Sequence, residues 1–426
     1  MNQESRLTAE SSLGDWLSWQ EHGHVKDVDL GLERVSAVYQ RLKNKTSKTI
    51  FTITVAGTNG KGSCVALLEA TLVHAGYRVG VYSTPHLLRY NERIRLNGNP
   101  VSDGVLTSSF SKIDNARGDI SLSYFEFGTL AALDIFEDER VDVQILEVGL
   151  GGRLDAVNIV DADATIISSI SIDHIDWLGD DRKKIALEKA GVFRPKQPAC
   201  CGDKTVPRSL IDYANKLDTA LSLAGRDFDY KRKGQGWCLT ADHALAGFYP
   251  LPSLQGQHQI QNAAACIHLL AKIQEKIPVS KKNIEYGLQH IALMGRLQQI
   301  RNSPDVFLDV AHNAESSLAL ARFIKKQHCT GTVHAVFSVL ADKQFDQVVE
   351  PFIGLIDQWH IAPIKNARSI SMTDLDQFLS GKLRQHCSRY QTINQAFMGA
   401  GNRLNEDDLV ICFGSFYVVE ACLEAL

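Results

Sequence analysis

The sequence has no uninterrupted apolar run near the roughly 18 residues that a membrane-spanning helix needs. Its first residues, MNQESRLTAE, carry acidic side chains and lack the apolar core of a secretory signal. We therefore expect a cytoplasmic protein without a membrane partner. The chain also lacks an excess of positive charge, because its formal net charge is -4. This balance argues against general nucleic-acid binding and favours small-molecule partners.

The sequence also lacks a cysteine pattern. Its nine cysteines include no C-x-x-C pair, and Cys200 and Cys201 are adjacent, which suits neither a disulfide framework nor a zinc site. We expect reduced structural thiols. Proline is scarce, with 11 residues, and we find no low-complexity tract or repeat of fixed period. Disordered and solenoid classes are therefore excluded, and an ordinary globular protein is predicted, with a monomer as the default.

Apolar segments of strand length alternate with helix-like segments, which is typical of an α/β fold with parallel sheets covered on both faces. A chain of 426 residues exceeds the usual size of one core, so we predict two domains. The N-terminal domain spans residues 1–295 and the smaller C-terminal domain spans residues 296–426. The predicted strands cover residues 51–57, 79–84, 143–149 and 164–170 in the first domain, and 306–311, 332–340, 358–364 and 409–416 in the second.

The pattern loosens between residues 200 and 255. There the segment GRDFDYKRKGQGW predicts a short hairpin or peripheral insertion. The following QGQHQIQNAAACIHLLAKIQ is helical in pattern. No function can be read from residues 200–255.

The first predicted strand runs into a glycine-rich loop and then a helix, which is the order of a phosphate cradle. Glycines let backbone N–H groups converge on phosphate oxygens, the helix N-terminus adds partial positive charge, Lys61 neutralises the β and γ oxygens, and Ser63 can face Mg²⁺. The spacing departs from G-x-x-x-x-G-K-[ST], and the alternative is a glycine turn with an exposed lysine. The predicted ATP-binding residues are Thr58, Asn59, Gly60, Lys61, Gly62 and Ser63.

Each later strand also delivers a polar side chain to the carboxyl edge of the sheet, where ligands of such folds bind. Thr84 could ligate a hard cation, although a turn residue is the alternative. Glu147 follows an apolar strand, as magnesium-binding carboxylates of phosphoryl-transfer sites do, or is a capping or salt-bridged acid. His174 follows the fourth strand and is a candidate metal ligand, against a satisfied core or surface histidine.

Taken together, the segments GTNGKGS, YSTPHL, LEVGLGGRLDAVN, DHIDWLG with EKAG, and DVAHN resemble the folylpolyglutamate synthase and dihydrofolate synthase family of the Mur ligase superfamily. The resemblance covers nearly the whole chain. It implies a P-loop ATPase-like N-terminal domain that holds ATP and pteroate, and a Rossmann-like C-terminal glutamate ligase domain. It also implies the bifunctional bacterial type, with dihydropteroate, tetrahydrofolates and L-glutamate as substrates.

The resemblance assigns further roles at matched positions. Thr84, Glu147 and His174 would bind Mg²⁺, and Lys189 would be carbamylated to hold a second Mg²⁺, whereas an exposed helical lysine is the alternative. Asn262, Arg296 and Asp309 would contact ATP. The implied pteroate site consists of Asp29, Leu30, Gly31, Phe125, Glu126, Arg153, Leu154 and Asp155. A helix start explains residues 29–34 almost as well.

The implied reaction activates a carboxylate with ATP, because the leaving oxygen of a free carboxylate is too poor for an amine to displace. An acyl phosphate would form and the glutamate amine would then attack it, with Lys61 and two Mg²⁺ offsetting charge. His312 or a path to solvent would take the amine proton, and the sequence does not choose between them. The alternatives are a cell-wall peptide ligase of the same superfamily, a P-loop phosphotransferase or ATPase, and a non-catalytic folate-binding module.

Overall fold

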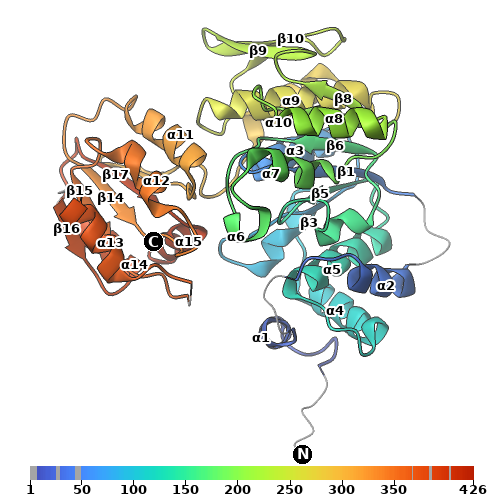
Figure 1. Cartoon of the computed structure of the whole chain (residues 1–426), viewed down its shortest axis with the longest axis horizontal. Coiled ribbons are helices and arrows are strands. Elements are labelled where there is room, and N and C mark those ends of the chain that lie inside the picture. Colours follow the sequence, from blue (N-terminus) through green and yellow to red (C-terminus); the bar gives the residue numbers. More distant parts are fainter. Residues whose placement is uncertain (1–6, 25–28, 44–48, 367, 383–385, 403) are drawn as a thin grey trace, which may run out of the picture. The chain divides into compact units, whose positions relative to one another are not determined.

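The computed structural model describes residues 7–24, 29–43, 49–366, 368–382, 386–402 and 404–426. The chain divides into two compact units, which we describe separately (Figure 1). The first unit comprises Met1–Ile170, Asp181–Leu251 and Ile260–Ile291. The second unit comprises Ser171–Asp180, Pro252–Gln259 and Ala292–Leu426. Two short segments from the N-terminal part of the sequence therefore group with the second unit, a division that a single boundary at residue 296 does not describe.

The first unit is built on an eight-stranded sheet in the order β4-β3-β2-β5-β1-β6-β7-β8. The six strands β2, β5, β1, β6, β7 and β8 pair in parallel in that order. Strands β3 and β4 add an antiparallel edge beside β2. The central strand β1 pairs with both β5 and β6. The strands are β1 (Phe51–Ala56), β2 (Val79–Tyr82), β3 (Ile94–Leu96), β4 (Asn99–Pro100), β5 (Val143–Glu147), β6 (Ala164–Ile167), β7 (Pro198–Cys201) and β8 (Ala220–Leu223).

Helices cover this sheet because apolar side chains occupy their inner faces. Helix α3 packs on β1, β2 and β5 and against α10, while α5 packs on β2. Polar caps fix where several helices begin; Ser123 and Glu126, for example, form a reciprocal capping box at the start of α5. The helices are α1 (Leu13–His22), α2 (Glu33–Leu42), α3 (Lys61–His74), α4 (Asp103–Arg117), α5 (Tyr124–Asp138), α7 (Arg182–Ala190), α8 (Arg208–Leu217), α9 (His258–Lys272) and α10 (Lys281–His290), with short 3₁₀ turns η1 (Tyr90–Arg93) and η2 (Ala156–Ile159).

A separate antiparallel sheet of three strands also belongs to the first unit. It consists of β9 (Phe228–Lys233), β10 (Gly236–Ala241) and β11 (Gly247–Pro250), in the order β11-β10-β9. Its β9–β10 hairpin extends beyond α9 and α10 (Figure 1). The predicted hairpin and the helix that follows it are thus both confirmed.

The second unit contains a six-stranded sheet in the order β12-β13-β17-β14-β15-β16, parallel except for the β12–β13 pair. Phe337, Trp359 and Phe413 contact one another in its core. The strands are β12 (Gln298–Arg301), β13 (Asp305–Leu308), β14 (Val333–Phe337), β15 (Gln358–Ile361), β16 (His386–Arg389) and β17 (Leu409–Phe413). The helices are α6 (Ile175–Leu178), α11 (Ala314–Ile324), α12 (Phe345–Val349), η3 (Glu350–Phe352), α13 (Met372–Asp376), η4 (Gln377–Lys382), α14 (Ile393–Gly401) and α15 (Phe416–Glu424).

The predicted α/β class is confirmed, and all eight predicted strands are present. The predicted strands extend beyond the carboxyl ends of the observed strands, because the residues that end each prediction leave the strand and begin the following loop. Sequence analysis missed short strands such as β7 and β16, which are too brief for a periodic signal. No helix in the described ranges has the length and apolar character needed to cross a membrane.

Two buried histidines on neighbouring strands of the second unit and a partly buried tyrosine form a chain of polar rings. His334 on β14 contacts His360 on β15, with Nδ1 and Nε2 3.1 Å apart, and Nδ1 of His360 lies 3.0 Å from the hydroxyl of Tyr390. Burial lowers the pKa of His334, and burial followed by the charge of His334 lowers the pKa of His360 to about 4. One proton suffices for the His–His hydrogen bond, because a second proton would place two N–H groups face to face.

These buried histidines should make the unfolding free energy depend on pH. Between pH 6.5 and 4 the unfolded chain binds a proton at His360 that the folded chain does not, so stability falls as pH falls, by about 2 kcal/mol from pH 7 to pH 5. We expect His360→Gln to lower the melting temperature at pH 7 but to lose less stability than the wild type between pH 7 and pH 5. Replacing the exposed His386 by Gln should retain the wild-type pH dependence. Thermal unfolding at both pH values checks this, and equal losses for His360→Gln and the wild type would refute it.

Candidate functional site

The predicted phosphate loop connects β1 to α3. Its backbone is tied to the residues that follow β6: the N–H of Thr58 donates to the carbonyl of Ser169 at 2.8 Å, and the N–H of Asn59 donates to its hydroxyl at 3.1 Å. Ser168 Oγ donates to the carbonyl of Asn59 at 2.7 Å. Lys61 begins α3, and its Nζ donates to the carbonyls of Gly57 and Thr58, both at 3.2 Å. The loop is therefore held in shape while its lysine ammonium lies against it.

Two glycines of this loop are required by their surroundings. A Cβ on Gly57 would lie 2.0 Å from Ser168 Oγ. Gly60 caps α3 with a left-handed φ of 86°, and a Cβ there would lie 2.6 Å from Asn262 Oδ1. Asn262 on α9, predicted from its own segment, thus lies against the loop that runs from Thr58 to Ser63.

Thr84 and Glu147 also come together, at the carboxyl ends of β2 and β5. The N–H of Thr84 lies 3.4 Å from Glu147 Oε2, and Glu147 is buried. The Thr84 hydroxyl accepts a hydrogen bond of 3.2 Å from Arg93. Within the ranges that the structure describes, no group of three or more His, Cys, Asp or Glu side chains could hold a metal ion. The predicted magnesium set contains only two such side chains, Glu147 and His174.

Lys189 is only 3% exposed on α7, which rules out the alternative of an exposed helical lysine. The glycine run of the third predicted motif approaches it closely, since a Cβ on Gly152 would lie 3.1 Å from the Lys189 carbonyl oxygen. Thr84, Glu147 and Lys189 belong to the first unit, whereas His174 belongs to a segment of the second. The predicted metal ligands are thus divided between the two units.

The first part of the predicted pteroate site is an ionic cluster in front of α2. Arg34 bridges two carboxylates, with 2.7 Å to Asp29 and 3.1 Å to Glu126. His24 Nε2 lies 3.2 Å from the same Asp29 oxygen. Glu126 is buried and also caps α5. The structure therefore joins the segment of Asp29, Leu30 and Gly31 to the start of α5, a contact that a simple helix start does not require.

The second part lies around the glycine loop after β5. A Cβ on Gly149 would lie 2.8 Å from the Phe125 ring and 3.4 Å from Asp155 Oδ2. The Asp155 carboxylate accepts backbone N–H groups from Gly149 at 3.0 Å and from Leu150 at 2.8 Å. Burial raises the pKa of Asp155 to about 6, although these N–H groups and Lys61 favour the ionised form. Phe125 and Asp155 therefore converge on one point.

The two remaining pteroate candidates sit differently. Arg153 forms an ion pair with Glu188 on α7, with 2.9 Å between Nη2 and Oε1, and its side chain is half exposed. Leu154 is half-buried. Arg153 is thus held toward the helix of Lys189.

Sequence analysis missed one cation at this edge. Arg93, at the end of η1, lies between the rings of Tyr90 and Tyr124, 5.4 Å from each centroid. Its Nε donates to His86 Nδ1 at 2.7 Å. Burial, followed by the charge of Arg93, lowers the pKa of His86 to about 4, so this imidazole stays neutral. The sequence signal for Arg93 is the run NERIR. Strand β3 in this run pairs antiparallel with β2 and so brings Arg93 back to Thr84.

In the second unit, Arg296 lies just before β12 and Asp309 follows β13. Asp309 accepts N–H groups from Leu297 and Ala311, both at 2.8 Å. Burial raises the pKa of Asp309, and the nearby Arg296 opposes that effect. The Arg296 guanidinium lies 5.2 Å from the ring centroid of Phe416. These two predicted nucleotide residues are therefore neighbours.

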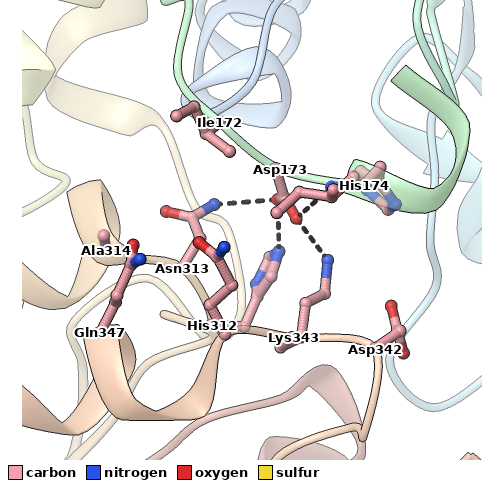
Figure 2. A pocket seen from close by; sticks show the side chains of 11 residues that line it. Ile172, Asp173, His174, His312, Asn313, Ala314, Asp342, Lys343 and Gln347 are labelled. Atoms are coloured by element: carbon pink, nitrogen blue, oxygen red, sulfur yellow. Dashed lines mark hydrogen bonds and ion pairs between the residues drawn. The ribbon is translucent and has the colours of Figure 1, made fainter. Parts of the chain in front are cut away.

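His312 lies in a pocket of the second unit with Asp173, Asn313 and Lys343 (Figure 2). Its Nδ1 is 2.7 Å from the Val310 carbonyl and its Nε2 is 3.4 Å from Asp173 Oδ2. A carbonyl oxygen only accepts, so the contact with Val310 places an N–H on Nδ1, and Nε2 faces the Asp173 carboxylate.

Comparison with known proteins identifies the family. The profile of the family "Mur ligase, glutamate ligase domain" matches residues 295–416. The chain is 40% identical to the dihydrofolate synthase/folylpolyglutamate synthase of Escherichia coli, over 98% of this chain and 96% of that protein.

Solved structures agree with this comparison. FolC from E. coli, solved with DHPP and ADP, superposes with a TM-score of 0.91 at 40% identity, covering 98% of each chain. A bifunctional folylpolyglutamate synthase/dihydrofolate synthase with bound Mn, AMPPNP and L-glutamate gives 0.89 at 40% identity, again over 98% of each chain. The resemblance inferred from the motifs is confirmed: this chain belongs to the dihydrofolate synthase/folylpolyglutamate synthase family, and residues 295–416 form a Mur ligase glutamate ligase domain.

Proposed function

We propose that this protein uses ATP to join L-glutamate to dihydropteroate, giving dihydrofolate, and to add further glutamates to tetrahydrofolates. The observation that carries the proposal is the phosphate loop, with Lys61 at the start of α3, in a chain that matches bifunctional relatives over almost its full length. The predicted division of labour remains part of the proposal: residues 1–295 hold ATP and pteroate, and residues 296–426 form the glutamate ligase domain.

The chain's own residues account for the need to hold anions. A carboxylate reacts with an amine only after activation, so the γ-phosphoryl group moves to the pteroate or folate carboxylate and the glutamate amine then displaces phosphate. Residues 58–63 hold the phosphates, and Lys61 with the N–H groups of residues 60–63 neutralises their charge. Asn262 contacts the loop from α9. We also propose that Arg296 and Asp309 bind ATP. His312 or a path to solvent takes the proton of the glutamate amine.

The donor set suits Mg²⁺, which prefers hard oxygen ligands. Thr84 and Glu147 supply a hydroxyl and a carboxylate that already lie together, His174 adds a ring nitrogen, and buried Lys189 would add a carboxylate once carbamylated. Bound Mg²⁺ would neutralise charge on the transferring phosphoryl group. The proposed pteroate site consists of Asp29, Leu30, Gly31, Phe125, Glu126, Arg153, Leu154 and Asp155. We further propose a monomer that works in the cytoplasm.

Three competing functions make different demands. A cell-wall peptide ligase would act on a uridine-nucleotide substrate, whereas the relatives that this chain matches over nearly its full length are dihydrofolate synthase/folylpolyglutamate synthases. A P-loop phosphotransferase or ATPase would turn over without glutamate and would leave the second unit without a role. A non-catalytic folate-binding module would need neither Lys61 nor the metal ligands.

The decisive assay measures phosphate release from ATP and Mg²⁺ with dihydropteroate or tetrahydrofolate, each with and without L-glutamate. We expect release to require both acceptor and glutamate, and the product mass to rise by one glutamyl residue. Lys61→Ala should slow release by about a hundredfold or more, because it removes the main cation of the loop. Release that ignores glutamate and yields no conjugate would support an ATPase instead.

A second prediction concerns the loop glycine that meets Asn262. Gly60→Ala should weaken binding of AMPPNP with Mg²⁺ by about tenfold or more, because the added Cβ displaces the loop or Asn262. Gly76→Ala is the matched control: its φ of +92° carries the same left-handed strain, but nothing lies within 4 Å of the added Cβ. The control should lower the melting temperature and leave nucleotide affinity unchanged. Equal affinities for both variants in calorimetric titration would refute the role of the Gly60 contact.

A third prediction uses the raised pKa of Asp155. The carboxylate can accept N–H groups of the pterin ring, so binding should weaken as pH falls through about 6 and the carboxyl becomes protonated. The wild-type KM for dihydropteroate should therefore rise between pH 8 and pH 5.5. Asp155→Asn should raise KM at pH 8 by about tenfold and abolish this pH dependence. A wild-type KM that stays flat over the range would remove Asp155 from pterin recognition.

A further inference from the structure

We propose that Asp173 is a positioning residue that anchors residues 171–180 and thereby fixes the backbone of His174. This segment follows β6 along the chain but groups with the second unit. The anchor is a property of the described geometry. Its consequence for catalysis rests on the proposed function, because it requires His174 to bind the metal.

The Asp173 carboxylate receives donors on both oxygens (Figure 2). Oδ1 accepts from Lys343 Nζ at 2.6 Å and from the N–H of His174 at 2.8 Å. Oδ2 accepts from Asn313 Nδ2 at 3.0 Å, and His312 Nε2 lies 3.4 Å away. Asn313 and Lys343 lie 140 and 170 residues further along the chain, so one carboxylate ties its own segment to two distant ones.

The ion pair between Asp173 and Lys343 matters for stability because it is buried. The side chains of Asp173 and Lys343 are only 7% and 8% exposed. Burial alone would raise the pKa of Asp173, but His312, Lys343 and His174 hold it well below its usual range. Asp173 is the only carboxylate paired with Lys343 among the described residues. Removal of either partner therefore leaves a buried charge without its counter-charge, which costs far more than loss of an exposed pair.

The anchor acts directly on the backbone of His174. This residue has a left-handed φ of 53° and caps the short helix α6. Left-handed geometry is unfavourable for a residue with a Cβ, so it persists only where contacts enforce it. Asp173 accepts the His174 N–H, while the His174 carbonyl accepts N–H groups from Trp177 and Leu178. Hydrogen bonds to the N–H and to the carbonyl of His174 thus hold the backbone from which its imidazole extends.

A second tether on the same segment provides a control. Ser171 Oγ donates to Glu315 Oε2 at 2.7 Å, but this contact is exposed. An exposed hydrogen bond contributes little, because water replaces either partner. Glu315→Gln therefore changes charge and contact on the same segment without touching the buried network.

The first experiment is hydrogen–deuterium exchange on the full-length wild type, Asp173→Asn, Lys343→Met, the double variant and Glu315→Gln. We expect the amides of residues 177–179 to exchange at least tenfold faster in each anchor variant, with the double variant no worse than the worse single variant. Glu315→Gln should stay within twofold of the wild type. Unchanged protection of β14 and β17 will verify that the variants fold. The anchor would be overturned if the amides of residues 177–179 exchanged at the wild-type rate in Asp173→Asn. It would also be overturned if the exchange effects of the two single variants added in the double variant.

The second experiment titrates Mn²⁺ in the presence of AMPPNP, followed by electron paramagnetic resonance. We expect Asp173→Asn to weaken Mn²⁺ binding at least fivefold and Glu315→Gln to leave it unchanged. Faster exchange with wild-type Mn²⁺ affinity would overturn the positioning of a metal ligand while the anchor itself stands. Failure of the glutamate-dependent ligase assay with faster exchange in Asp173→Asn would refute the proposed function and not the anchor, so the two failures can be told apart.

Discussion

The arrangement of the first unit depends on the parallel pairing of β1 with β5 and β6. Parallel pairing places the carboxyl ends of these strands at one edge, and the chain must leave that edge in loops whose backbone groups need partners. The phosphate loop finds them in Ser168 and Ser169 after β6. Thr84 finds Glu147 in the same way, after β2 and β5. One constraint on strand direction therefore assembles residues that are up to about a hundred positions apart.

The fold could be predicted because its signals are local. Continuous apolar runs mark the buried parallel strands, and the loop of residues 57–63 combines glycines, a lysine and a hydroxyl within a few residues. The hairpin at β9–β10 follows from glycine and charge alternation. The resemblance to the family named Asn262, Phe125 and Asp155 as site residues, and the structure places Asn262 against the loop and both Phe125 and Asp155 beside Gly149.

What could not be predicted depends on long-range packing. Arg93 stands in the charged NERIR run, but that run does not show its partners, because only the antiparallel return of β3 brings Arg93 to Thr84 and His86. Burial separates Lys189 from an ordinary helical lysine, and helical periodicity in a nine-residue helix does not reveal it. The grouping of residues 171–180 with the second unit was equally invisible, because covalent continuity with β6 suggested membership of the first sheet. Lys343 and Asn313, which hold that segment, carry no motif that names Asp173 as their partner.

The interleaving of the two units restricts how the chain can be divided. It crosses between units after residues 170, 180, 251, 259 and 291, so no single cut releases an intact second unit. A fragment that began at residue 292 would contain Lys343, Asn313 and His312 without the carboxylate of Asp173. Its buried ammonium would then have to recruit water or an anion from solution. Recombinant study of the glutamate ligase domain alone would therefore report on a different electrostatic interior from that of the whole protein.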